Sequence, residues 1–212
     1  PPRRTGSTKS TAHTEIATFR AKSGSGKFKL SRADVATGLV SIVDDPNKVQ
    51  QGSLNLCGPA AFLHVWVKRD PVAVARFGAT LFDTGEAKIG NLSIEPGSDL
   101  RNQDYATVKG RMTYVCPPAD WMIMSSIRDS ENAIVDFEGT PEEDFAGMTT
   151  PEEVTDWLKS TGLYKSVSNE ANWVSTKGTS HALGLVPTAK RDIIMLVNAH
   201  VLAGSNKKKD PD

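Results

Sequence analysis

The sequence predicts an α+β fold, in which a helical subdomain packs on a sheet. Helix-forming patterns dominate the earlier part of the chain. The last strong apolar segment, residues 191–202, is rich in β-branched residues and predicts a central strand. Residues 88–94 predict two short strands around a Gly90-Asn91 turn. Helices early and strands late favour the α+β class.

Five segments carry the apolar spacing or the start signals of helices: 31–45, 58–68, 71–81, 121–130 and 150–158. Ser31 is placed as the N-cap of the first segment. The second is apolar on most sides, which predicts a buried helix, and Pro71 is suited to start the third. Thr150 and Glu153 have the spacing of a capping box, and Gly162 is placed to end the last helix.

Residues 1–30 are expected to form a flexible basic leader, and residues 31–212 one domain. The leader is rich in Ser, Thr and Gly and has seven basic residues against one acidic residue. The chain begins with Pro-Pro, and residues 207–212 have the composition of a loop. We therefore expect a piece of a longer protein, with the domain truncated at its C-terminal end.

The overall charge excludes some default partners. The chain has 25 basic and 25 acidic residues, so no global field favours nucleic acid or an anionic membrane. No apolar segment is long enough to predict a membrane span, and the start of the sequence lacks the pattern of a signal peptide. No metal or cofactor site is expected, because the acidic clusters have no His at ligand spacing.

Cys57 stands at the expected start of the second helix and is the candidate nucleophile. A thiol attacks a carbonyl as its thiolate, which the N–H groups and the positive dipole end of a helix favour. Gly58 allows a close approach of substrate, and Ser53 or Asn55 is placed to cap the helix. The oxyanion formed by the attack needs donors, and Gln51 is close enough in sequence to supply its side-chain amide.

Residues 51–61, QGSLNLCGPAA, resemble the papain-like cysteine peptidases, whose signature reads Gln-Gly-x-Cys-Gly-x-Cys-Trp. The Cys-Gly-Pro-Ala-Ala part is similar to the bacterial branch that includes the peptidases of bacteriocin exporters and secreted effectors and toxins. The resemblance implies a papain-like fold, a helical part on an antiparallel sheet. It also implies that Cys57 is the nucleophile, that Gln51 completes the oxyanion hole and that a later His is the base. The signature's Trp and its first Cys are absent here.

The chain has four histidines, and His200 is the leading candidate for the base. It lies in the late predicted strand, where the resemblance places this residue. His181, in a loop or short helix, is the second candidate. His13 falls in the leader. His64 lies on the helix of Cys57 but about 10 Å further along its axis, too far to reach the thiol.

The base is also open to a third assignment, beyond Asp212. Residues 203–212 have the composition of a loop that precedes such a strand. The family's third residue, an Asn or Asp that orients the imidazole, should follow the His. Asn206, Asp210 and Asp212 are the residues of these types after His200, and none lies in a convincing strand.

The resemblance implies a thiol hydrolase that cleaves a peptide or amide bond through a Cys thioester. It implies the toxin or effector domain of a larger bacterial protein, secreted or delivered into a target cell. Its partners would be a protein or peptide substrate, the rest of the polypeptide and an immunity protein. A deamidase or acyltransferase on the same fold and an inactive, protein-binding papain-like module stay open. A disulfide between Cys57 and Cys116 would exclude the nucleophile, although Cys116 is expected to be buried and inert.

Overall fold

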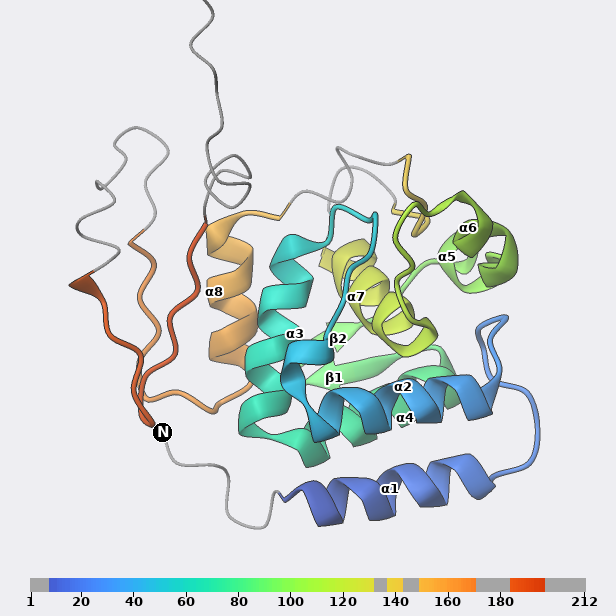
Figure 1. Cartoon of the computed structure of the whole chain (residues 1–212), viewed down its shortest axis with the longest axis horizontal. Helices are drawn as coiled ribbons and strands as arrows, with labels where there is room; N and C mark the ends of the chain where they lie inside the picture. Colours follow the sequence, from blue (N-terminus) through green and yellow to red (C-terminus); the bar gives the residue numbers. More distant parts are fainter. Residues whose placement is uncertain (1–7, 132–136, 143–148, 171–183, 197–212) are drawn as a thin grey trace, which may run out of the picture. The chain divides into compact units, whose positions relative to one another are not determined.

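The computed structural model describes residues 8–131, 137–142, 149–170 and 184–196. The chain divides into two compact units, residues 1–169 and 170–212, and the first holds all the described helices (Figure 1). The predicted mixture of helix and strand is confirmed, but in the described residues helix far outweighs strand.

The described part of the first unit contains eight α-helices, one 3₁₀ turn and one two-stranded sheet. The helices are α1 Lys9–Ala21, α2 Arg32–Asp44, α3 Cys57–Arg69, α4 Pro71–Thr84, α5 Ser98–Asn102, α6 Tyr105–Arg111, α7 Pro118–Glu131 and α8 Pro151–Ser160, and the 3₁₀ turn η1 is Pro46–Lys48. Strands β1 (Ala87–Ile89) and β2 (Leu92–Ile94) pair antiparallel, with Ile89 opposite Leu92. The predicted hairpin around Gly90-Asn91 is therefore confirmed.

The predicted helix starts are confirmed at both capping positions. The Ser31 hydroxyl accepts a hydrogen bond from the Asp34 N–H. Thr150 and Glu153 form the complete capping box at the start of α8. Glu153 also forms an ion pair with Arg128 of α7, at 2.7 Å, so the same carboxylate that caps α8 ties it to α7.

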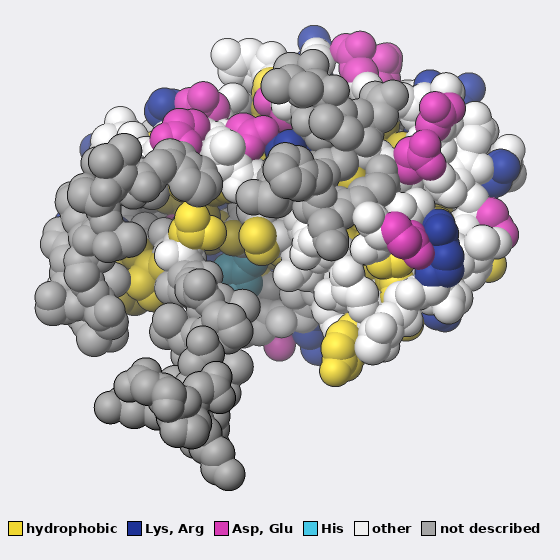
Figure 2. All heavy atoms as spheres, turned by 90° about the horizontal axis from the view of Figure 1, so that it is seen from above, with side chains coloured by type: hydrophobic (Ala, Val, Ile, Leu, Met, Phe, Trp, Pro, Cys, Tyr) yellow, Lys and Arg dark blue, Asp and Glu magenta, His cyan; other side chains and the backbone are white. Residues whose placement is uncertain are grey.

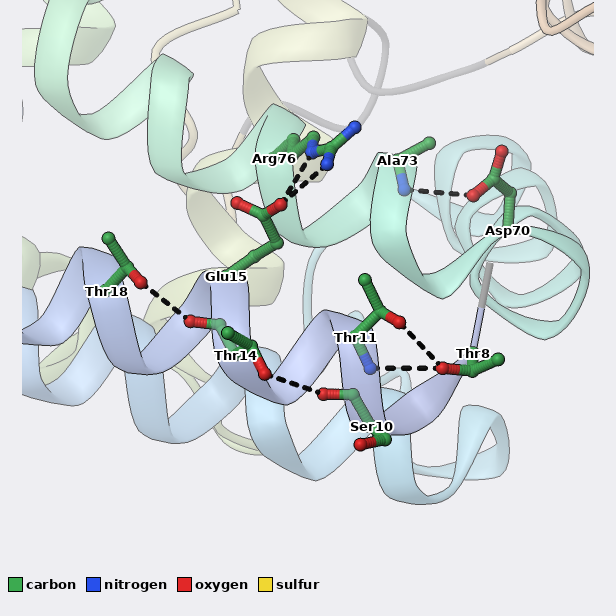
Figure 3. Close-up of polar contacts among 9 residues, drawn as sticks. All are labelled: Thr8, Ser10, Thr11, Thr14, Glu15, Thr18, Asp70, Ala73 and Arg76. Carbon is green, nitrogen blue, oxygen red and sulfur yellow. Dashed lines mark hydrogen bonds and ion pairs between the residues drawn. The ribbon is translucent and has the colours of Figure 1, made fainter. Parts of the chain in front are cut away.

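Residues 9–21 form α1, so the expectation of a flexible leader is wrong there. Ala12, Ile16 and Phe19 recur at helical spacing and are buried, and α1 packs on α2 and α4. The Thr8 hydroxyl caps the helix by accepting a hydrogen bond from the Thr11 N–H (Figure 3). These residues form a narrow apolar stripe, which is hard to see in a segment of polar composition. A helix with such a stripe becomes stable only when other helices cover it.

One ion pair and one contact between a histidine and a carboxylate also hold α1 against its neighbours. Glu15 accepts two hydrogen bonds from the Arg76 guanidinium of α4, at 2.6 and 3.0 Å (Figure 3). His13 lies partly exposed with its Nε2 2.8 Å from the Asp44 carboxylate of α2.

The core of the first unit joins α3 to α8, which matters for the candidate site. Trp157 of α8 is fully buried, and its ring meets Phe62 of α3 edge-on, with 5.8 Å between the ring centroids. Phe62 also contacts Trp66 on the same helix. These aromatic contacts fix α8 beside α3.

In the second unit, residues 192–196 do not form the predicted strand. Thr188 and Arg191 form an isolated antiparallel bridge with two backbone hydrogen bonds, and the chain after it has no ladder in the described residues. A β-branched run favours a strand, but it becomes one only where a second segment supplies a pairing edge. Residues 197–202 of the predicted strand lie outside the described residues. The expected order of helices followed by strands is therefore wrong in the described chain.

A partly buried ionic cluster closes the contact between α1, α2 and α4. The Arg32 guanidinium lies 4.8 Å from the ring centroids of both Phe19 and Phe82, a cation–π arrangement. It also pairs with Asp83, which accepts a second hydrogen bond from Lys22. Burial acts to raise the pKa of Asp83, but the bonds and charges of the two cations outweigh it and hold this pKa below its ordinary value.

We expect Asp83→Asn to lower the free energy of unfolding by about 1 kcal/mol at neutral pH. A carboxyl with a lowered folded-state pKa stabilises the fold above its unfolded pKa, and this stabilisation is lost as pH falls through the folded pKa. The difference between variant and wild type should therefore shrink as pH falls below 3.8, the ordinary pKa of this carboxyl. Urea denaturation at neutral and at acidic pH measures it. Asp156→Asn, which breaks an exposed pair with Lys159, is the control and should change little; equal effects of both variants would contradict the expectation.

Candidate active site

Cys57 is the first residue of α3, and its side chain is exposed. The N-cap position is Leu56, which makes no side-chain capping hydrogen bond. Because Pro59 has no N–H, the first turn of α3 offers the N–H groups of Cys57 and Gly58. The thiol therefore lies at an uncapped helix N-terminus, where backbone donors and the helix dipole favour negative charge.

The two cysteines are both free and differ in environment. Cys116 is fully buried, and its thiol donates to the Gln50 carbonyl oxygen at 3.2 Å. Burial, together with the nearby Asp120 carboxylate, raises the pKa of the Cys116 thiol well above its ordinary value. The predicted burial of Cys116 is confirmed, and the Cys57–Cys116 disulfide is not formed. Cys57 is thus the accessible thiol.

The loop that precedes α3 is held by a distant segment, residues 112–116. The Ser53 N–H donates to the Tyr114 carbonyl oxygen at 2.8 Å, and the Ser53 hydroxyl accepts from the Tyr114 N–H at 2.7 Å. Ser53 is therefore occupied with Tyr114 and does not cap α3 as expected. Gly52 has φ +62°, and a Cβ at this position would lie 2.3 Å from the Tyr114 carbonyl oxygen.

Gln51 belongs to the loop that leads into α3. The Leu54 N–H donates to the Gln51 carbonyl oxygen at 3.2 Å, which closes a turn between them. Leu54 and Leu56 are buried in the core and anchor the rest of the connection. The Gln51 Oε1 is buried and has no hydrogen-bond partner among the described residues. Because Oε1 only accepts hydrogen bonds, an oxyanion cannot be its partner, and the donor expected from Gln51 is its side-chain N–H group.

Thr149, just before α8, is a site residue that the sequence did not reveal. A Cβ on Gly58 would lie 2.5 Å from the Thr149 Cβ, so the start of α3 requires glycine there. The Thr149 Oγ1 is buried and has no partner within the described chain. It adds a polar group at the N-terminus of α3. No spacing rule could have found it, because more than 90 residues separate it from Cys57.

Asp120 holds the loop before α3 through a hydrogen bond to its backbone. This residue lies in the first turn of α7, is fully buried and accepts a hydrogen bond from the Gln50 N–H at 2.8 Å. Burial raises the pKa of Asp120 to about 7, although the Gln50 bond acts to lower it. The Tyr105 hydroxyl donates to the Cys116 carbonyl oxygen, and burial raises the pKa of Tyr105 as well.

The described histidines do not contact Cys57. His64 is half-buried, and its Nδ1 lies 3.0 Å from the Pro46 carbonyl oxygen, which agrees with the expectation that it cannot reach the thiol. His13 is engaged with Asp44 on another helix. His181 and His200, the two candidates for the base, lie outside the described residues.

Three further observations bear on ligands and partners. In the part of the chain that the structure describes, no cluster of His, Cys, Asp or Glu could hold a metal ion. None of the described helices has the length and apolarity to cross a membrane. On the face shown in Figure 2, acidic and basic side chains are interspersed among the coloured residues.

A shallow hollow lies apart from Cys57, and the described contacts do not connect the two. It is lined by residues of the C-terminal part of α3, of α4 and of β1, among them Trp66, Phe77 and Lys88. The chemistry expected at Cys57 is therefore not assigned to this hollow.

Comparison with protein-family models, curated proteins and solved structures gave no match. The functional argument therefore rests on the geometry around Cys57 and on the sequence of residues 51–61.

Proposed function

We propose that this chain is a papain-like thiol hydrolase that cleaves a peptide or amide bond. The observation that carries the proposal is the exposed thiol of Cys57 at the uncapped N-terminus of α3. Gln51, the expected oxyanion donor, lies in the loop that leads into this helix, and that loop is held in place by Tyr114. An accessible thiol, backbone donors and a side-chain amide are the groups that acyl transfer to cysteine needs.

In the proposed reaction, His200 is the base that takes the proton of the Cys57 thiol, with His181 as the alternative. The thiolate attacks the carbonyl carbon, and the oxyanion accepts hydrogen bonds from the Cys57 N–H and the Gln51 amide. The C–N bond then breaks, and the amine leaves with the proton from the imidazolium. Water, deprotonated by the same His, hydrolyses the thioester, which releases the acid and restores the thiol.

We further propose that the chain is the toxin or effector domain of a larger bacterial protein, secreted or delivered into a target cell, with a protein or peptide substrate. Support for this assignment comes from the likeness of residues 51–61 to the Cys-Gly-Pro branch of the papain-like peptidases.

Selective alkylation tests the proposal. At about pH 6, iodoacetamide should label Cys57 at least about tenfold faster than a model thiol, because a helix N-terminus favours the thiolate. Peptide mass spectrometry after timed quenching gives the rates at both cysteines. Buried Cys116 is the internal control and should react only after unfolding in urea, where the two rates become similar. Labelling of Cys57 no faster than the model thiol would favour the inactive, protein-binding module instead.

The product distinguishes the remaining reactions. Incubation with a peptide library followed by mass spectrometry should show two fragments whose masses sum to the substrate plus water. A mass increase of about 1 Da at a Gln or Asn side chain would show deamidation, in which ammonia leaves and water again resolves the thioester. A substrate joined to an added amine would show acyl transfer, in which the amine resolves the thioester.

A further inference from the structure

Gln50, the residue before Gln51, is held at both of its backbone polar groups. The Gln50 N–H donates to the Asp120 carboxylate at 2.8 Å, and the Gln50 carbonyl oxygen accepts from the Cys116 thiol at 3.2 Å. Both partners are fully buried, whereas Gln51 is only half-buried. The loop therefore has one fixed point inside the core, next to the residue expected to stabilise the oxyanion.

The two partners of Gln50 are themselves fixed. Asp120 belongs to the first turn of α7, a helix of 14 residues that is buried along most of its length. Cys116 is held by its neighbours: its carbonyl oxygen accepts from the Tyr105 hydroxyl, and its N–H donates to the Met112 sulfur at 3.3 Å. Motion of the Gln50 backbone would break its bonds to Asp120 and Cys116 inside the core, where water cannot replace them.

We infer that Asp120 is a positioning residue for the oxyanion donor, acting through the Gln50 peptide on the backbone from which Gln51 projects. The inference rests on the proposed function, in which Gln51 binds the oxyanion. An oxyanion donor works only when it is directed in advance at the position where charge develops, so a small displacement weakens it. Burial of a carboxylate lowers the stability of a fold. The hydrogen bond to the Gln50 N–H gives the buried Asp120 a function that offsets this cost.

The substitution of Asp120 should affect the chemical step. Asp120→Ala removes the acceptor, and we expect kcat to fall about tenfold with KM little changed, a fraction of the 10²–10³ typical for loss of a whole oxyanion donor. Asp120→Asn keeps an oxygen for the Gln50 N–H and should restore kcat to within about twofold of wild type. Asn has the shape of Asp but no charge, so rescue by Asp120→Asn would show that the hydrogen bond, and not the charge, is required.

A double-mutant cycle with Gln51→Ala tests whether Asp120 acts through Gln51. If it does, Asp120→Ala should cost less than about twofold in kcat once Gln51 is absent. Asp129→Ala is the matched control, since Asp129 also lies on α7 and accepts from a loop N–H, that of Gly97, at 2.6 Å. Its effect should be the same with and without Gln51. Additive losses for Asp120→Ala would overturn the inference.

Amide hydrogen exchange gives a readout that needs no activity. Asp120→Ala should speed exchange at residues 50–52 at least about tenfold, and Asp120→Asn should not. Unchanged exchange would overturn the inference. If the wild type hydrolyses no peptide or amide, the proposed function fails, whereas faster exchange would still establish the hold of Asp120 on the loop.

A second pair of variants covers the case in which Asp120→Ala does not fold. Cys116→Ser retains a donor for the Gln50 carbonyl oxygen, and Cys116→Ala does not. The same contrast in kcat, and in exchange at residues 50–52, is expected between them. Equal behaviour of the two variants would contradict positioning through the Gln50 peptide.

Discussion

Cys57→Ala should reduce peptide or amide hydrolysis by at least about 10³-fold, because removal of a nucleophile leaves only binding and oxyanion stabilisation. The free energy of unfolding should change by less than ~0.5 kcal/mol, because the side chain is exposed. Initial rates with peptide substrates, followed by mass spectrometry, measure the first effect, and thermal unfolding measures the second.

Ser98→Ala provides a matched control for this variant. Ser98 is exposed and is the first residue of α5, as Cys57 is of α3. Hydrolysis by the Ser98 variant should equal that of wild type. A Cys57 variant that keeps its rate would exclude the thioester mechanism, whatever the alkylation experiment shows.

Gly52→Ala should lower the free energy of unfolding by about 3 kcal/mol, from backbone strain together with overpacking. The backbone at Gly52 has φ +62°, and the new Cβ would lie 2.3 Å from the Tyr114 carbonyl oxygen and 2.5 Å from the Cys116 nitrogen. These are backbone atoms, so the loop itself must move. Urea denaturation with linear extrapolation measures the change.

Gly162→Ala separates strain from collision. Gly162 has nearly the same φ, +64°, but no atom lies within 4 Å of an added Cβ. Its substitution should cost only about 1 kcal/mol, the strain of a left-handed residue. Equal losses of unfolding free energy at the two glycines would mean that the contact with residues 114–116 does not hold the loop in place.

The parts of the fold that were predicted correctly depend on neighbours in sequence. Ser31 and Thr150 mark helix starts because a cap bonds to an N–H three residues away. The hairpin at Gly90-Asn91 depends on one glycine with φ +62°. These interactions are local, so a single sequence contains all the information needed to find them.

The parts that were missed depend on contacts between distant segments. The apolar stripe of α1 is short. It stabilises the helix only when α2 and α4 pack on it and bury Ile16 and Phe19. Residues 192–196 were predicted to belong to a strand but do not form one. Their composition favours a strand, but composition does not show whether a second segment is present to pair with it. The papain-like fold, which the resemblance of residues 51–61 implies, stays a proposal.

The candidate site divides in the same way. Cys57 at a helix start follows from residues 51–61 alone, and the structure confirms this placement. The groups around it do not follow, because Asp120 and Thr149 come from α7 and from the start of α8. A sequence pattern therefore identified the exposed thiol at a helix start but could not identify the groups that hold its surroundings.

The bonds between the Gln50 loop and the segment around Cys116 also set an order of events during synthesis. Their partners are separated by 61 to 70 residues, so the loop cannot take its final geometry when Cys57 leaves the ribosome. Contacts of such long sequence separation form late, since a large loop must close first. Until residues 114–120 have been synthesised, the thiol is exposed without the holds on Gln50 and Ser53, and the arrangement around Cys57 is completed only after α7 has joined the core.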